Sequence, residues 1–101
     1  MHDSRVVAEH FGRNVLLHRR RARLSQEELA FRASLHRTEI GKLERGITLA
    51  RIDTVVKLAG GLEVEAGVLF EGLLWTAGTN IVGRFSAPSL SPLPQRRGRV
   101  D

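Results

Sequence analysis

One segment near the middle of the chain, residues 25–45, constrains the fold more than any other. Ser25 is followed three residues later by Glu28, a pair that can form a capping box, in which each side chain accepts a hydrogen bond from the other residue's backbone N–H. The box predicts the start of a short helix over residues 26–33. A second short helix is predicted over residues 37–45. Two short helices joined by so brief a turn form a helix-turn-helix unit.

Three small or apolar residues have the spacing that this unit needs. Ala30 is small where the two helices touch, Leu35 lies in the turn, and Ile40 holds the second helix five residues later. Other compact helical bundles can show the same spacing, so the pattern alone is a moderate signal. In a helix-turn-helix, the first helix crosses a DNA backbone and the second projects into the major groove. The segment therefore indicates a sequence-specific DNA-binding protein with its recognition helix at residues 37–45.

Apolar residues at helical spacing predict three further helices. They are expected over residues 5–23, 51–60 and 65–75. The helix at residues 51–60 is expected to bury four apolar residues: Ile52, Val55, Val56 and Leu58. Together with the central unit, these helices predict an all-α fold of five helices in one domain over residues 1–75.

The apolar pattern fades after the predicted fifth helix. Residues 86–101 contain all three prolines of the chain, together with Ser, Gly and Arg, a composition typical of disordered segments. We therefore predict a flexible basic tail over residues 76–101. Within it, Ile81 and Val82 with Phe85 are consistent with a short strand or a helical turn.

The charge of the chain gives only weak support for a nucleic-acid partner. The formal net charge is +5 at pH 7, and basic domains often bind nucleic acid. However, residues 1–75 hold twelve Lys and Arg against ten Asp and Glu, while the remaining residues hold four Arg and one Asp. The predicted domain is therefore nearly balanced, and the DNA-binding prediction depends on the motif.

Several other classes of protein are excluded by the residue types present. The chain has no cysteine, which excludes disulfides and thiolate metal sites and fits a reducing cytoplasm. The histidines lack metal-ligand spacing, and no nucleophile with a neighbouring base stands out, so we expect no metal, no cofactor and no enzymatic activity. No stretch approaches the about 18 apolar residues of a membrane span, and the polar N-terminus lacks a signal-peptide core. We expect a cytoplasmic protein without membrane contact.

Several motifs at matching separations resemble the phage-repressor-like helix-turn-helix family, also called the Cro/CI-type or XRE family. They are Phe11-Gly12, Arg19, the run S-Q-E-E-L-A at residues 25–30, Ile40, the run L-E-R-G at residues 43–46, and Leu58-Ala59. The resemblance spans roughly residues 10–72. It implies a lambda-repressor-like domain of five helices that binds double-stranded DNA and regulates transcription.

Three positions in the turn and the recognition helix depart from the family's pattern. Ser34 stands where the turn usually has Gly, which predicts a left-handed backbone at a residue with a side chain. His36 replaces the usual Ser or Asp before the recognition helix and is a poorer cap. Gly41 stands where Ser is usual and lowers the intrinsic helix propensity. We therefore expect a recognition helix that is softer than those of its relatives.

The resemblance also implies DNA contacts for individual residues. Base contacts are implied for three residues whose donors and methyl group suit base edges: Arg37, Thr38 and Lys42. Phosphate contacts are implied for three more: Gln26, Arg45 and Arg20. Without the resemblance, Arg37 and Lys42 would be interpreted as solvated charges on a helix.

One further pair, Arg19 with Glu44, is implied to form a largely buried ion pair between the first and third helices. We interpret this pair as structural. Removing one partner would leave the other charge buried and unpaired, so a loss of DNA binding in such a variant would report unfolding.

The apolar end of the predicted fifth helix indicates a protein partner. Three residues there are candidates for a dimer interface: Phe70, Leu74 and Trp75. A homodimer would present two recognition helices about 34 Å apart and bind a near-palindromic operator. An alternative is an antitoxin-type protein, whose C-terminal part binds a partner protein while the helix-turn-helix regulates its own operon. A third possibility is a domain that keeps the fold but has lost DNA binding.

Overall fold

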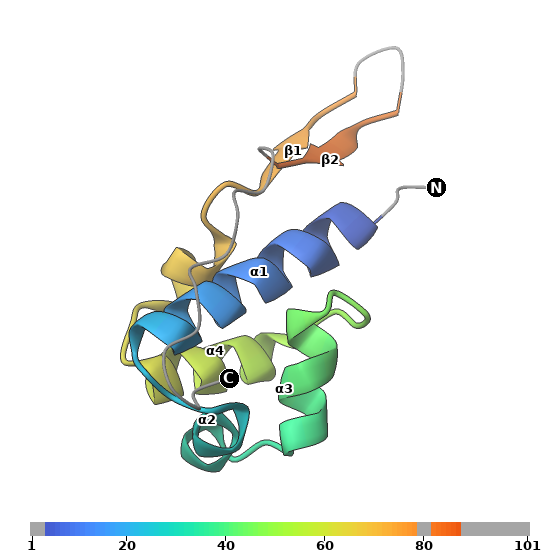
Figure 1. Cartoon of the computed structure of the whole chain (residues 1–101). Coiled ribbons are helices and arrows are strands. Elements are labelled where there is room, and N and C mark those ends of the chain that lie inside the picture. The colour runs from blue at the N-terminus through green and yellow to red at the C-terminus, as the bar shows by residue number, and fades with distance from the viewer. Residues whose placement is uncertain (1–3, 79–81, 88–101) are drawn as a thin grey trace.

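The computed structural model describes residues 4–78 and 82–87. Within these residues the chain forms four α-helices, a 3-10 helix and two short strands. They are α1 (Arg5–Arg21), α2 (Gln26–Ala33), α3 (Arg37–Glu44), α4 (Ile52–Leu62), η1 (Ala66–Phe70), β1 (Leu74–Thr76) and β2 (Arg84–Ser86). Figure 1 shows α2 and α3 at one end of the molecule and the β1–β2 hairpin projecting away from the helices at the other.

The core is assembled from apolar residues contributed by every helix. α1 packs against α3 and η1, and α2 packs against both α3 and α4. The most completely buried apolar side chains are Val15, Leu29, Ile40, Leu58 and Leu69. Because each of these elements buries one face only, the outer face of α3 remains free to contact a partner.

The prediction of a fifth α-helix over residues 65–75 is wrong. In its place, η1 ends at Phe70, and Gly72 follows with a φ of 89°. This left-handed backbone conformation favours glycine and breaks the helical path. The apolar residues that follow form strand β1, which pairs antiparallel with β2 so that Trp75 faces Phe85. The described part of the chain is therefore mostly helical rather than all-α.

Part of the segment predicted to be a flexible tail, residues 76–101, belongs to the hairpin. Strand β1 runs across the expected domain boundary after residue 75. Strand β2 lies inside the segment expected to be flexible and contains Phe85, for which a short strand was one of the two alternatives. The rings of Trp75 and Phe85 pack edge to face with centroids 4.8 Å apart. Residues 79–81 and 88–101 lie outside the described residues, and with them Ile81 and most of the predicted tail.

Two residues of α4 that were expected to be buried are exposed. Ile52 and Val56 are 85% and 59% exposed, whereas Val55 and Leu58 are buried. Residues four apart share a helix face, so Ile52 and Val56 point outward together while the neighbouring face packs on α1 and α2. The outward pair leaves a large apolar surface uncovered.

In the part of the chain that the structure describes, no helix has both the length and the apolar character needed to cross a membrane.

Candidate nucleic-acid interface

The start of α2 is fixed by the capping box that the sequence predicted. The Ser25 hydroxyl accepts from the backbone N–H of Glu28 at 3.0 Å, and the Glu28 carboxylate accepts from the backbone N–H of Ser25 at 2.8 Å. The hydrogen bond from the Ser25 backbone, followed by that from its side chain, lowers the pKa of Glu28. The box confirms the prediction and orients the first turn of α2.

The turn between α2 and α3 is tight and left-handed at one residue. Ser34 has φ 54° and ψ 46°, which confirms the expected left-handed conformation. The next residue, Leu35, donates its N–H to the carbonyl of Ala30 at 2.9 Å and packs against the core. The Glu39 carboxylate then accepts from the backbone N–H of His36 at 3.1 Å, which helps to fix the start of α3.

A close approach between α1 and α3 sets the position of α3. A Cβ atom at Gly12 would lie 1.9 Å from the carbonyl oxygen of Leu43, closer than any real contact. Gly12 therefore lets the two backbones touch. Beyond α3, Gly46 has a φ of 71° and turns the chain away from the helix.

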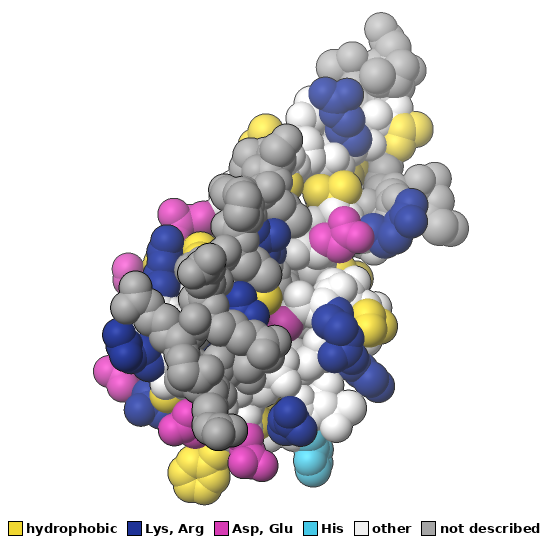
Figure 2. Space-filling model, viewed as in Figure 1, with side chains coloured by type: hydrophobic (Ala, Val, Ile, Leu, Met, Phe, Trp, Pro, Cys, Tyr) yellow, Lys and Arg dark blue, Asp and Glu magenta, His cyan; other side chains and the backbone are white. Residues whose placement is uncertain are grey.

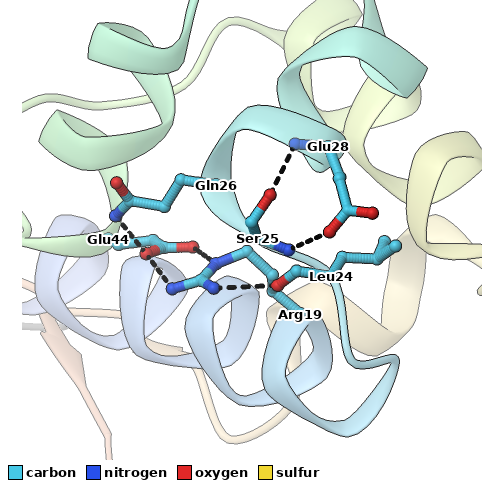
Figure 3. A network of polar contacts seen from close by, with 6 residues as sticks. All are labelled: Arg19, Leu24, Ser25, Gln26, Glu28 and Glu44. Atoms are coloured by element: carbon cyan, nitrogen blue, oxygen red, sulfur yellow. Dashed lines mark hydrogen bonds and ion pairs between the residues drawn. The ribbon is translucent and has the colours of Figure 1, made fainter. Parts of the chain in front are cut away.

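A buried ion pair joins α1 to the end of α3 (Figure 3). Arg19 donates from Nε to Oε2 of Glu44 at 2.6 Å and from Nη2 to Oε1 at 2.9 Å, and its Nη1 donates to the Leu24 carbonyl at 3.0 Å. The side chains of Arg19 and Glu44 are 0% and 3% exposed. The structure thus brings together the two residues that the resemblance paired.

Gln26 belongs to the same network. Its Nε2 donates to Oε1 of Glu44 at 2.9 Å, so one carboxylate oxygen accepts from both Arg19 and Gln26 (Figure 3). No sequence pattern indicates this contact, because Gln26 and Glu44 lie on different helices and no fixed spacing relates them. The contact links the buried pair to a residue at the exposed end of α2.

The outer face of α3 carries the residues expected to contact bases. Ile40 and Leu43 are buried, whereas Arg37, Thr38 and Lys42 are exposed. Figure 2 shows Lys and Arg side chains over the part of this face where Figure 1 places α3. The side chains that hold α3 and those available to a ligand are therefore on opposite sides.

A shallow hollow, here called the recognition hollow, lies between α2 and α3. It is lined by Gln26, Arg37, Thr38, Gly41 and Arg45. The lining contains two arginines and no acidic residue, so it favours an anionic or hydrogen-bond-accepting group. Four of the expected DNA contacts thus share one site, together with a glycine that was expected to soften α3.

Two expected DNA contacts lie outside the recognition hollow. Lys42 lines a neighbouring hollow with Glu39 and Arg51, among others. Arg20 lies on α1, is partly exposed, and is not part of the lining of either hollow. The base-contacting candidates therefore divide between two adjacent surfaces of α3.

The three candidates for a dimer interface are all exposed, but they lie on different elements. Phe70 on η1 is 44% exposed and its ring centroid lies 5.5 Å from that of Phe11, while Leu74 and Trp75 on β1 are 61% and 44% exposed.

Among residues 4–78 and 82–87, no group of three or more His, Cys, Asp or Glu side chains is placed to hold a metal ion.

A capped helix, a tight turn and a second helix with an exposed polar face define a helix-turn-helix DNA-binding domain. The helix-turn-helix family model matches residues 17–69, and the chain belongs to this family, in its phage-repressor-like or XRE type. It is a DNA-binding transcriptional regulator of that type. The match ends before β1, so the hairpin lies beyond the family domain.

Two controller proteins are similar to this chain. It is 40% identical over 45 residues to control protein C.BamHI of Bacillus amyloliquefaciens, an alignment that spans 45% of this chain and 56% of that protein. The crystal structure of the restriction-modification controller protein C.AhdI from Aeromonas hydrophila matches with a TM-score of 0.66 at 36% identity. That match covers 68% of this chain and all of C.AhdI.

Proposed function

We propose that this chain is a sequence-specific regulator that binds a near-palindromic operator as a homodimer and controls restriction–modification genes. The observation that carries the proposal is the exposed face of α3, where Arg37, Thr38 and Lys42 lie opposite the buried residues that fix the helix. The proposed target genes follow from the similarity to C.AhdI, a restriction-modification controller protein.

The proposed base contacts follow from the chemistry of α3. Arg37 and Lys42 can donate to guanine O6 and N7, and Thr38 can use its hydroxyl or place its methyl group against that of thymine. All three are exposed, and their positions on a helix whose inner face is buried in the core give them a defined register in the major groove.

Phosphate contacts are proposed at the edges of the same surface. The first turn of α2 has backbone N–H groups without partners inside the helix, which suits a phosphate beside Gln26. Arg45 follows α3 and Arg20 lies on α1, so both are proposed to contact the DNA backbone. Such contacts set the position of the protein on the duplex and carry no sequence information by themselves.

An apolar groove provides the surface proposed for dimerisation. It is lined by Val7, Ala8, Phe11, Leu49, Ala50, Ile52, Val55 and Phe70. Ile52, Leu49 and Phe70 are 85%, 56% and 44% exposed, which is unusual for large apolar residues that share one surface. A second copy related by a two-fold axis would cover these residues. The dimer would then present its two α3 helices to successive turns of the major groove of DNA.

An antitoxin-type function is the second candidate, and the hairpin is the feature that favours it. Leu74 and Trp75 are exposed on β1, beyond the family match at residues 17–69. They are proposed to contact either a second copy or a different protein. Purification as a clean homodimer supports the first function, and a stoichiometric second protein supports the alternative.

Selection of bound sequences from random DNA, followed by salt titration, tests the main proposal. We expect a preferred, near-palindromic site. Replacing Arg37 and Lys42 together by Ala is expected to abolish the preference. Lys57→Ala on α4 removes one exposed cation elsewhere and is the control. Equal affinity for all sequences would contradict base recognition by α3.

A further inference from the structure

The side-chain amide of Gln26 has one chemically permitted orientation. Its Nε2 donates to Oε1 of Glu44 at 2.9 Å, and the same oxygen accepts from Nη2 of Arg19 at 2.9 Å. A carboxylate paired with a guanidinium has no hydrogen to donate, so the nitrogen end of the amide has to face it. The carbonyl oxygen of Gln26 therefore points away from Glu44, as Figure 3 shows.

That carbonyl oxygen borders a space left by Gly41. A Cβ atom on Gly41 would lie 3.1 Å from Nη1 of Arg45, 3.9 Å from its Cζ, and 4.0 Å from Oε1 of Gln26. Arg45 follows Gly41 by four residues, so its side chain lies back over the preceding turn. Gly41 is buried although it lies on the outer face of α3, and Nη1 of Arg45 is the atom nearest to the place of its missing Cβ.

We propose that Gly41 and Gln26 are positioning residues for Arg45. The inference rests on the proposed function, because it requires that α3 faces DNA. Gly41 leaves the space in which the guanidinium lies across α3. In the DNA complex, Gln26 accepts one of its N–H groups through Oε1, which the hydrogen bond to Glu44 holds toward the same space.

This arrangement determines what Arg45 offers to DNA. A guanidinium has five N–H donors in a fixed plane, so one can be held by Gln26 while two others face outward. Two parallel donors match a pair of acceptors. On DNA, such pairs are guanine O6 with N7 and two oxygens of one phosphate.

The variant Gln26→Lys separates the positioning role from a direct phosphate contact. Lysine can donate to Glu44 and to phosphate, but it cannot accept a hydrogen bond from Arg45. We expect the ratio of affinities for the selected duplex and for a random duplex to fall on the order of tenfold. A ratio equal to that of the wild type overturns the inference for Gln26.

The variant Gly41→Ala has a matched control in Gly60→Ala. Both place Ala inside a helix, and both are expected to raise the melting temperature. A Cβ atom at Gly60 would meet nothing within 4 Å, whereas one at Gly41 would lie 3.1 Å from Nη1 of Arg45, so the guanidinium has to shift from its place over α3. Only Gly41→Ala is therefore expected to lower affinity for the selected duplex. Equal affinities for the two variants overturn the inference for Gly41.

A double-mutant cycle with Arg45→Met completes the test. Because both residues act through Arg45, Gly41→Ala and Gln26→Lys should have little further effect once Arg45 is replaced. Full additivity overturns the inference. In that case the proposed function still stands if the wild type prefers the selected duplex, whereas a wild type without sequence preference overturns both.

The same Arg45→Met variant identifies the acceptor pair. Loss of discrimination at one guanine, reproduced in the wild type by 7-deazaguanine at that position, assigns the contact to a base edge. An equal loss of affinity for all sequences assigns the contact to a phosphate. In that case the slope of log affinity against log salt concentration should also be shallower by about one. Either outcome supports a positioned Arg45, and no effect of the variant on either duplex overturns it.

Discussion

The guanidinium of Arg19 and the carboxylate of Glu44 meet through two hydrogen bonds, 2.6 Å and 2.9 Å long, between α1 and α3. Neither side chain has appreciable access to water. In such a site, the attraction between the charges mainly offsets the cost of removing them from water. The pair therefore fixes how the helices meet, and each partner depends on the other.

Replacement of one partner is expected to be severely destabilising. Arg19→Met leaves the Glu44 carboxylate buried without its cation, which should lower the free energy of unfolding by about 3–5 kcal/mol in urea denaturation. The control is Arg51→Gln, which removes an exposed pair with Asp53 whose side chains are 83% and 57% exposed. That variant should change stability by about 1 kcal/mol or less. Similar losses in the two variants would contradict the structural role of the buried pair.

The contact between Gly12 and Leu43 predicts a second strongly destabilised variant. In Gly12→Ala the added methyl group meets the Leu43 carbonyl oxygen, so α1 and α3 have to separate. Overpacking of this kind costs about 1–3 kcal/mol, measurable as a lower melting temperature. Gly60→Ala, which fills open space in α4, should instead stabilise by about 0.5–1 kcal/mol. A stable Gly12→Ala variant would show that the helices are not in contact there.

The capping box predicts a dependence of stability on acid. The pKa of Glu28 is lowered from 4.5 in the folded chain, first by the Ser25 backbone hydrogen bond and then by the Ser25 side chain. The unfolded chain therefore takes up the proton more readily, and this contribution is present above pH 4.5 and lost as the pH falls below it. The difference in melting temperature between wild type and Glu28→Gln should thus be larger near neutral pH than at about pH 3. A difference that does not change with pH would contradict the box.

His18 predicts a second dependence on pH, in a higher range. Burial, followed by the charge of Arg21, lowers the pKa of His18 from 6.5, although Glu71 acts in the opposite direction. Because the folded state binds the proton less well, stability should fall as the pH drops below 6.5. His18→Gln should lose less stability than the wild type between about pH 7.5 and pH 5 in urea denaturation. Parallel curves for the two proteins would refute this contribution.

The exposed groove predicts which residue controls dimerisation. Ile52→Glu places a charge in the proposed interface and should weaken the dimer by on the order of 2 kcal/mol, measured by sedimentation equilibrium. Phe31→Glu is a matched control, because Phe31 on α2 is 86% exposed and lies outside the groove lining, while Ile52 is 85% exposed. If the two variants dimerise equally well, the interface lies elsewhere, and the hairpin becomes the next surface to test.

The helix-turn-helix could be predicted from the sequence because its determinants are local. The capping box at Ser25 and Glu28 depends on residues three apart, and the left-handed turn at Ser34 was implied by the family's usual Gly at that position. The burial of Ile40 follows from its spacing to Leu35. Each of these is specified within one or two helical turns.

The pairing of β1 with β2 and the Gln26 contact could not be predicted, because they depend on residues distant in sequence. The apolar run through Leu74 and Trp75 has no period that separates a helix from a strand, and β1 forms only because β2 pairs with it. Similarly, the Gln26–Glu44 hydrogen bond requires the angle between α2 and α3. The outward position of Ile52 was missed for the same reason: spacing predicts an apolar face but not which neighbour covers it.

The double use of the Glu44 carboxylate has a consequence for how this chain can evolve. A mutation at this position acts on folding through Arg19 and on the candidate DNA surface through Gln26, so selection would remove it on two separate grounds. Glu44 hydrogen-bonds to Arg19 and Gln26, and none of these hydrogen bonds involves Arg37, Thr38 or Lys42. New operator preferences are therefore expected to arise by substitution of these exposed residues, while Glu44 and its two partners change little.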